Sequence, residues 1–197
     1  MQRKFEEALD CAARWHAHQS RKGTRVPYVA HLLGVASLVL EDGGTTTEAI
    51  AALLHDAVED QGGPRRLAEI RRRFGPRVAA IVQGCTDTDQ SPKPPWRPRK
   101  EAYLRHLEYA SLPVLRVSLA DKLHNARAIL ADYQRVGNRV WGRFSAPRRD
   151  VLWYYRQLVT CFERRLPGVM AAELNRCVSA MTRMRGVRTC TDNRLRT

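Results

Sequence analysis

The sequence predicts an all-α fold organised as a single domain. Apolar residues recur with helical spacing along most of the 197 residues, and alternating strand patterns are almost absent. No linker, low-complexity segment or internal repeat divides the chain. A chain of this length fits one domain and can bury a core without disulfides. We therefore expect roughly eight helices around one core.

The first half of the chain shows the helical spacing most clearly. Glycines, a proline and capping threonines mark the ends of the apolar stripes. The expected helices are 3–18, 27–41, a stretch from the threonines at 45–47 to about Gly62, and short helices around 67–74 and 78–82.

The second half begins with a proline-rich segment. Residues 86–98 contain four prolines, which predict a loop rather than a helix or strand. We expect a helix at 99–109, and then a long helix from Pro113 whose residues are apolar on almost every side. Such a helix is central and buried. Two extra helices are expected at 146–165 and 169–183.

The charge balance is strongly basic. The formal net charge is +14, from 34 Lys and Arg against 20 Asp and Glu, which favours anionic partners. Part of this excess lies at 176–197, where six arginines accompany one acid, Asp192. No aromatic stacking pattern accompanies them, so RNA binding is disfavoured. We expect one helical domain at 1–185 and, at 186–197, a basic C-terminal tail that can remain disordered.

The compartment expected from the sequence is the cytoplasm. Acidic residues interrupt the N-terminal stretch where a signal peptide would be apolar, and no run approaches the ~18 apolar residues of a membrane span. The chain has five cysteines, an odd number, and no two of them lie close together in the sequence. Reduced, mostly buried thiols are therefore expected, rather than a disulfide framework or a zinc site.

The most informative run is 51–60 (AALLHDAVED), where an apolar helix ends in ionisable residues. In a continuous helix, Glu59 lies one turn beyond His55, and Asp60 lies one turn beyond Asp56. Burying these carboxylates together requires a neutralising cation. The pattern therefore predicts a metal site with nearby acids for proton transfer, although a solvated helix end with ordinary surface acids is the alternative.

Two further polar positions interrupt apolar helices. Asp121 lies in the run 118–125 (SLADKLHN) and shares a helix face with Asn125, one turn later. A charged aspartate in so apolar a helix rarely stays unpaired. His31 lies between two apolar residues, where a hydrogen-bonded core histidine is the alternative to a metal ligand. Convergence of these residues on one ion would explain all three oddities.

These motifs resemble those of the HD superfamily of metal-dependent phosphohydrolases. Their flanks are similar to the hydrolase domain of Rel/Spo-type alarmone enzymes: residues 21–31 (RKGTRVPYVAH), 52–60 (ALLHDAVED), 74–86 (FGPRVAAIVQGCT) and 119–127 (LADKLHNAR). The loop at 92–100 (PKPPWRPRK), added to these motifs, makes the chain similar to the stand-alone small alarmone hydrolases. The resemblance covers about residues 3–135.

The resemblance implies removal of the 3′-pyrophosphate from ppGpp or pppGpp, which gives GDP or GTP and pyrophosphate, with one divalent ion that is usually Mn²⁺. By position, the implied metal ligands are His31, His55, Asp56 and Asp121, the acids that position or deprotonate the attacking water are Glu59 and Asp60, and the substrate contacts are Arg21, Lys22 and Asn125.

This chain departs from the family pattern in two places. Ala128 stands where long Rel enzymes often have threonine, which puts one ribose-side hydrogen bond in doubt. The spacing between Arg21 and His31 is also one residue longer, which can move the turn that contacts the base.

The proline-rich loop carries cations that could hold the pyrophosphate. Lys93, Arg97 and Lys100, with Arg99 beside them, are the candidates, and an ordinary solvated loop is the alternative. Trp96 is interpreted as an anchor for the loop rather than as a base-stacking residue.

Two other functions remain open from the sequence. The same catalyst could act on adenosine alarmones or on the 2′-phosphate of NADPH, because an arginine can stack on either purine. Alternatively, the chain could be an inert nucleotide-sensing or RNA-binding helical module, although a vestigial site has no reason to keep every ligand. The expected partner is a small phosphorylated nucleotide, not a membrane or a nucleic acid, and a homo-oligomer is compatible with the sequence.

Overall fold

The computed structural model describes residues 2–88 and 92–184. Within these residues there are ten α-helices, one 3-10 helix and no strand beyond an isolated bridge between Ser20 and Pro27. The all-α prediction is confirmed. The basic tail at 186–197 lies outside the described residues. The elements are α1 (Gln2–Trp15), α2 (Val29–Glu41), α3 (Thr46–Leu54), α4 (Ala57–Asp60), α5 (Gly63–Phe74), α6 (Pro76–Cys85), α7 (Trp96–Leu107), α8 (Leu112–Val136), η1 (Gly137–Arg143), α9 (Arg148–Arg165) and α10 (Val169–Arg183).

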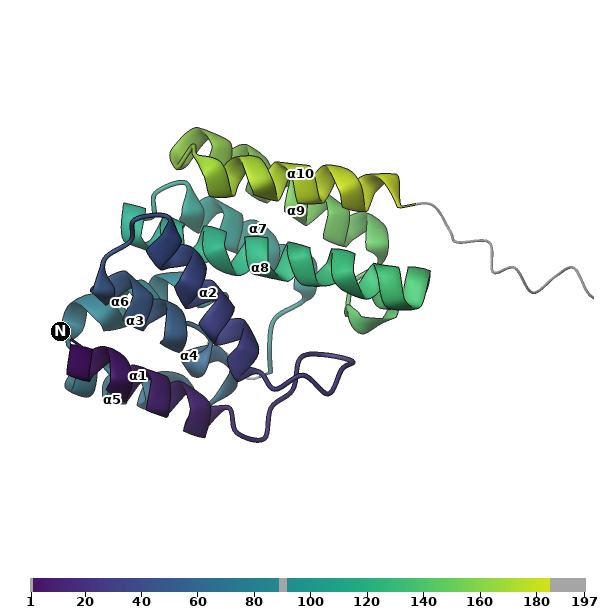
Figure 1. Ribbon diagram of the computed structural model, residues 1–197. Helices are drawn as coiled ribbons and strands as arrows, with labels where there is room; N and C mark the ends of the chain where they lie inside the picture. Colours follow the sequence, from purple (N-terminus) through teal and green to yellow (C-terminus); the bar gives the residue numbers. More distant parts are fainter. Residues whose placement is uncertain (1, 89–91, 185–197) are drawn as a thin grey trace, which may run out of the picture.

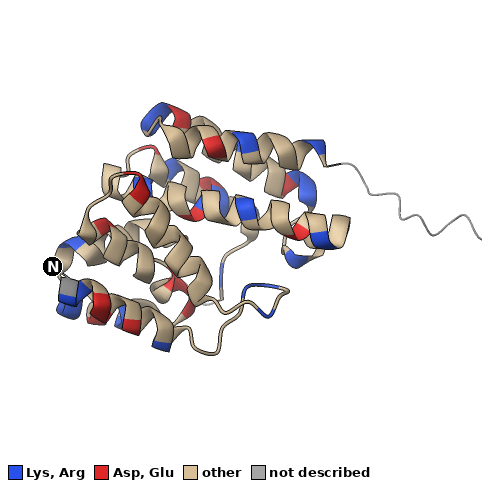
Figure 2. Cartoon of the chain, in the orientation of Figure 1, with Lys and Arg blue, Asp and Glu red and all other residues tan. Residues whose placement is uncertain are grey.

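The long helix α8 is the centre of the fold, as its apolar pattern predicts. It packs against α2, α3 and α6 on one side and against α9 and α10 on the other (Figure 1). Lys and Arg positions occur on helices throughout the view in Figure 2, so the described residues form no single basic stripe there. None of the described helices is both long enough and apolar enough to cross a membrane.

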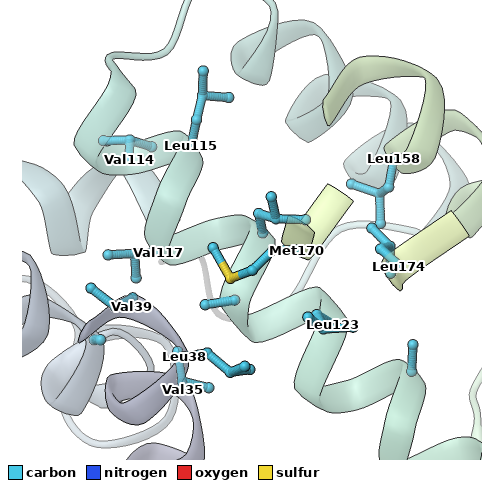
Figure 3. Close-up of a cluster of buried hydrophobic side chains, with 14 of the residues drawn as sticks. Val35, Leu38, Val39, Val114, Leu115, Val117, Leu123, Leu158, Met170 and Leu174 are labelled. Atoms are coloured by element: carbon cyan, nitrogen blue, oxygen red, sulfur yellow. The ribbon is translucent and has the colours of Figure 1, made fainter. Parts of the chain in front are cut away.

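The core fills the space on both sides of α8. Leu115, Val117 and Leu123 of this helix lie between valines and leucines of α2 and residues of α9 and α10 such as Leu174 (Figure 3). Cys11, Cys161 and Cys177 are buried free thiols and Cys85 is a partly buried one, whereas Cys190 lies outside the described residues. The N-terminal layer and the C-terminal helices are therefore joined through one helix.

Helix α3 begins with the capping interaction that the threonines predict. The Thr45 hydroxyl accepts a hydrogen bond from the Glu48 backbone N–H, and the Glu48 carboxylate accepts one from the Thr45 N–H at 2.7 Å. Glu48 also forms an ion pair with Arg116 of α8. This capping box fixes where α3 starts and ties it to the central helix.

The prediction of one continuous helix through residues 51–60 is wrong. Helix α3 ends at Leu54, and the four-residue helix α4 begins at Ala57. The His55 ring nitrogen Nδ1 lies 2.8 Å from the Ala52 carbonyl, which would accept from the Asp56 N–H in a continued helix. His55 and Asp56 therefore occupy a junction between two helices, rather than one face of a single helix.

Two other boundaries differ from the sequence expectation. Helix α7 begins at Trp96 rather than Arg99, so Pro98 lies in its first turn. A proline is tolerated there because the first N–H groups of a helix have no intrahelical partner. The 3-10 helix η1 was not anticipated. In contrast, α9 and α10 begin and end within two residues of the predicted limits.

Candidate active site

His31, His55, Asp56 and Asp121 converge at one point in the fold. They come from α2, from the α3–α4 junction and from α8. His55 Nε2 lies 3.0 Å from Asp56 Oδ2 and 3.7 Å from Asp121 Oδ1. His31 Nε2 lies 3.5 Å and 3.3 Å from the same two carboxylate oxygens. The predicted convergence is therefore present in the structure.

The donor set fits a divalent cation. The Nε2 atoms of His31 and His55 are buried and have no hydrogen-bond partner. His55 directs Nδ1 to a backbone carbonyl, which fixes the ring with Nε2 toward the carboxylates. Burial alone would lower the pKa of His55, but Asp56 and Asp121 raise it well above its usual range. The cluster therefore carries negative charge that a proton or a cation must neutralise.

Neighbouring side chains hold the two carboxylates in place. The Tyr28 hydroxyl donates to Asp56 Oδ2 at 2.6 Å. Asp121 accepts from Lys122 Nζ and from Asn125 Nδ2, each at 2.5 Å. The sequence analysis assigned no role to Tyr28 or Lys122. Both stand inside the motifs, next to the residues that it singled out, which is the signal that could have identified them.

The orientation of His31 depends on a close approach of two helices. His31 Nδ1 lies 3.0 Å from Nδ1 of His124 on α8. Burial, followed by the influence of His31, lowers the pKa of His124 to about 4. Gly34 of α2 faces this ring, and a Cβ added there would lie 2.3 Å from His124 Nε2. A glycine inside a helix costs roughly 1 kcal/mol relative to alanine, and here it provides the space for His124.

Glu59 and Asp60 lie on α4, directly after the junction that carries His55 and Asp56. Glu59 Oε1 accepts from Lys93 Nζ at 2.8 Å. Asp60 Oδ2 accepts from Gln19 Nε2, also at 2.8 Å. Both acids are partly exposed, so water can reach them. The sequence analysis did not identify Gln19.

A cavity of about 330 Å³ extends along α8 next to this cluster. Asn125 lines it and also donates to Asp121, so the cavity begins one helical turn from the His–Asp cluster. Arg21 Nη2 donates to Asn125 Oδ1 at 2.6 Å, which fixes the guanidinium at the wall. The lining comprises Arg21, Lys22, Tyr28, Trp96, Lys100, Lys122, Asn125, Ala128, Ile129, Asp132, Val140, Arg143, Phe144, Val151, Tyr154 and Tyr155.

The three loop cations have different surroundings. Lys100 lines the cavity, donates to Asp87 at 2.6 Å, and has a pKa that burial lowers. Lys93 is paired with Glu59, and Arg97 lies 3.3 Å over the ring of Trp153 and pairs with Glu101. Neither Lys93 nor Arg97 is among the lining residues. The structure therefore brings one of these three cations to the cavity.

The far wall comes from a part of the chain that the sequence analysis left without a function. Arg143 is the last residue of η1 and Phe144 comes directly after it, whereas Tyr154 and Tyr155 belong to α9. The Tyr154 hydroxyl is buried without a hydrogen-bond partner. The only available signal was the aromatic run at 153–155 within an otherwise ordinary helical pattern. Trp96 lines the cavity and also packs edge-on against Tyr154, so its position fits both the anchoring and the base-stacking interpretations.

Comparison with known families decides where this fold belongs. A family model described as the HD domain matches residues 8–152. The chain belongs to the HD domain family. The match includes every residue of the His–Asp cluster, both acids on α4 and the start of α9.

Its relatives include guanosine-3′,5′-bis(diphosphate) 3′-pyrophosphohydrolases called MESH1. The chain is 41% identical to the Xenopus tropicalis protein over 124 residues, which are 61% of this chain and 66% of that protein. The Homo sapiens protein is 39% identical over the same shares. The chain thus matches these relatives over 66% of their length, just under two thirds.

A solved structure supports the same relationship over a longer stretch. It is described as a metazoan ortholog of SpoT that hydrolyzes ppGpp, and it is 26% identical, with a TM-score of 0.75. The alignment covers 90% of this chain and 94% of that one. A structure of lmo0812 from Listeria monocytogenes aligns with a TM-score of 0.68 at 28% identity. The similarity therefore includes the C-terminal helices beyond the HD-domain match.

Proposed function

We propose that this chain hydrolyses the 3′-pyrophosphate of guanosine alarmones, which converts ppGpp or pppGpp into GDP or GTP and pyrophosphate. The observation that carries the proposal is the continuity from the His–Asp cluster, through Asn125, into a cationic and aromatic cavity. A nucleotide that is phosphorylated at both the 3′ and the 5′ position needs the His–Asp cluster at the bond that is cut and the cavity for the rest of the molecule. The names of the relatives support the same reaction.

His31, His55, Asp56 and Asp121 are proposed to hold one divalent ion, with Mn²⁺ as the expected ion. Mixed imidazole and carboxylate ligands suit such an ion, and they leave coordination positions free for water and substrate. When bound, the ion would lower the pKa of water and stabilise negative charge that develops on the phosphoryl oxygens. Tyr28, Lys122 and Asn125 keep the carboxylates oriented toward the cluster.

The protein's own side chains would perform the remaining steps. Glu59 and Asp60 orient the attacking water and accept its proton, because they are the exposed acids that follow the junction. Arg21 and Lys22 would contact the purine, with the Arg21 guanidinium held in place by its hydrogen bond to Asn125. Lys100 and Lys122 line the cavity and supply charge for the phosphates.

The test is to identify the products formed by manganese-loaded protein. We would incubate ppGpp, an adenosine alarmone, NADPH and a simple phosphate monoester, and follow each reaction by phosphorus-31 NMR. The proposal predicts GDP and intact pyrophosphate from ppGpp at equal rates. Orthophosphate as the first product would contradict it. Faster turnover of NADPH or the adenosine nucleotide would assign the same catalyst to another substrate, and full metal occupancy without turnover would favour the sensor function.

A further inference from the structure

A chain of hydrogen bonds connects a buried histidine to one of the two proposed catalytic acids. His16, near the end of the first helical segment, is only 2% exposed. Its Nδ1 lies 2.6 Å from Oε1 of Gln19, and Nε2 of Gln19 donates to Asp60 Oδ2 at 2.8 Å. Gln61 also donates to Gln19 Oε1, at 2.8 Å. Gln19 therefore stands between the interior of the protein and Asp60.

The Asp60 carboxylate sets the orientation of the Gln19 amide. A carboxylate only accepts, so the amino group of Gln19 faces Asp60 and its carbonyl oxygen faces Gln61 Nε2 and the His16 ring. A flipped amide would place its oxygen against the Asp60 oxygen. In the tautomer of His16 with a proton on Nδ1, both partners donate to the Gln19 oxygen.

The backbone around Gln19 is held equally firmly. The Gln19 N–H donates to the His16 carbonyl, and the Gln19 carbonyl accepts from the Tyr28 N–H, each at 2.9 Å. The His16 ring also stacks on the Tyr28 ring, with centroids 5.2 Å apart. Tyr28 donates to Asp56. One small framework therefore orients a metal-binding carboxylate and a proposed catalytic carboxylate together.

We propose that Gln19 is a positioning residue that acts through Asp60. Its amide holds the Asp60 carboxylate in a fixed direction, and His16 and Gln61 contact the other end of the amide. The role of Asp60 in turnover rests on the proposed function, whereas the effect of Gln19 on the carboxylate itself does not.

The two acids share one cation but differ in the contact with Gln19. Lys93 Nζ lies 2.8 Å from Glu59 Oε1 and 3.9 Å from Asp60 Oδ1. Gln19 donates to Asp60. The amide therefore restrains the direction of Asp60, whereas the nearly half-exposed Lys93 restrains Glu59.

Two variants separate the contacts of Gln19. Gln19→Glu is isosteric, and its carboxylate can still accept from His16 and Gln61, but it offers no donor to Asp60. Gln19→Leu removes every contact. Gln157→Glu, at an exposed position of α9, is the matched control for the added charge. Thermal melting and metal content of each variant would establish that the fold and the cluster persist.

The first measurement needs no substrate. Crystal structures of the metal-loaded wild type, both Gln19 variants and the control would compare the direction of the Asp60 carboxylate. We expect one conformer of the Asp60 side chain in the wild type and the control, and another conformer or several in the Gln19 variants. The wild-type conformer in both Gln19 variants overturns the proposal, whatever the enzyme hydrolyses.

The second measurement is a double-mutant cycle in turnover. Gln19→Leu should lower kcat by roughly 10–100-fold with KM nearly constant, and it should have little further effect in an Asp60→Asn background. Independent, multiplying losses would show that Gln19 does not act through Asp60 and would overturn the proposal. If the wild type hydrolyses none of the nucleotides, the proposed function fails, and the direction of the Asp60 carboxylate in the variants still decides the role of Gln19.

Discussion

The two sides of the cavity are built in different ways. The metal side, which carries the proposed ligands His31, His55, Asp56 and Asp121, consists of side chains inside short motifs. Neighbours in the same motifs fix them, as Lys122 and Asn125 fix Asp121. The far side consists of residues such as Arg143 and Tyr154, which reach the cavity through the packing of η1 and α9. The residues proposed for catalysis therefore depend on neighbours that are close in the sequence. The shape of the cavity depends instead on packing between segments that are distant in the sequence.

The largest effect is expected on the metal side. His55→Ala or Asp121→Ala should reduce bound metal from about one ion per chain to almost none, and turnover by at least about 10³-fold, because several kcal/mol of transition-state stabilisation are lost. Metal analysis and initial rates test this. His106→Ala, at an exposed histidine of α7, is the control and should keep its metal. Equal metal content in all variants would refute the assigned ligands.

Removing an acid without removing the metal should have the next largest effect. Glu59→Gln is expected to keep its ion and to lose turnover by roughly 10²–10⁴-fold, the range of general acid–base groups. The same samples would be used for metal analysis and kinetics. Loss of the ion would make Glu59 a ligand, and normal turnover would remove it from the mechanism.

The close approach of α2 and α8 provides a steric test of the metal side. Gly34→Ala places a methyl group against the His124 ring, and this overpacking should cost about 1–3 kcal/mol and weaken metal binding through His31. Gly142→Ala is the matched control, because a Cβ there meets nothing within 4 Å. Chemical denaturation and metal titration measure both effects. Equal stability of the two variants would show that His124 can move without cost.

The far side should respond in KM rather than in kcat. Lys100→Met removes a cation from the cavity and should raise KM for ppGpp several-fold, whereas Arg97→Met should change it little, because Arg97 lies over Trp153. The difference should shrink with added salt, since charges are screened over ~8 Å at physiological ionic strength. Similar KM values at low salt for both variants would remove Lys100 from phosphate binding.

The smallest effect concerns the cap of α3. Burial alone would raise the pKa of Glu48, but hydrogen bonds from Thr45 and the Arg116 guanidinium lower it below 4.5. A lowered pKa in the folded state adds stability that is present above the unfolded value and is lost as pH falls. Glu48→Gln should therefore cost about 1 kcal/mol at neutral pH and less in acid. Urea unfolding at neutral and acidic pH measures the free energy of unfolding of the wild type and of Glu48→Gln. A difference between them that does not change with pH would contradict this prediction.

The sequence predicted the parts that depend on local spacing. The limits of α9 and α10, the Thr45 cap and the convergence of His31, His55, Asp56 and Asp121 followed from periodicity and motifs. The break between α3 and α4 did not follow from these patterns, because it involves a contact between the His55 ring and the Ala52 carbonyl. The placement of Lys93 beside Glu59 and the far wall of the cavity depend on contacts between distant segments, which no spacing rule describes.

The position of Asp121 on the central helix has a consequence for the life of the protein in a cell. The same helix packs the core together, so an ion bound to its carboxylate adds to the stability of the whole chain. Free metal at about 100 times its dissociation constant would contribute about 2.7 kcal/mol. When that metal becomes scarce, more chains unfold and meet proteases. Metal supply would then set how long the protein survives, as well as how fast each copy works.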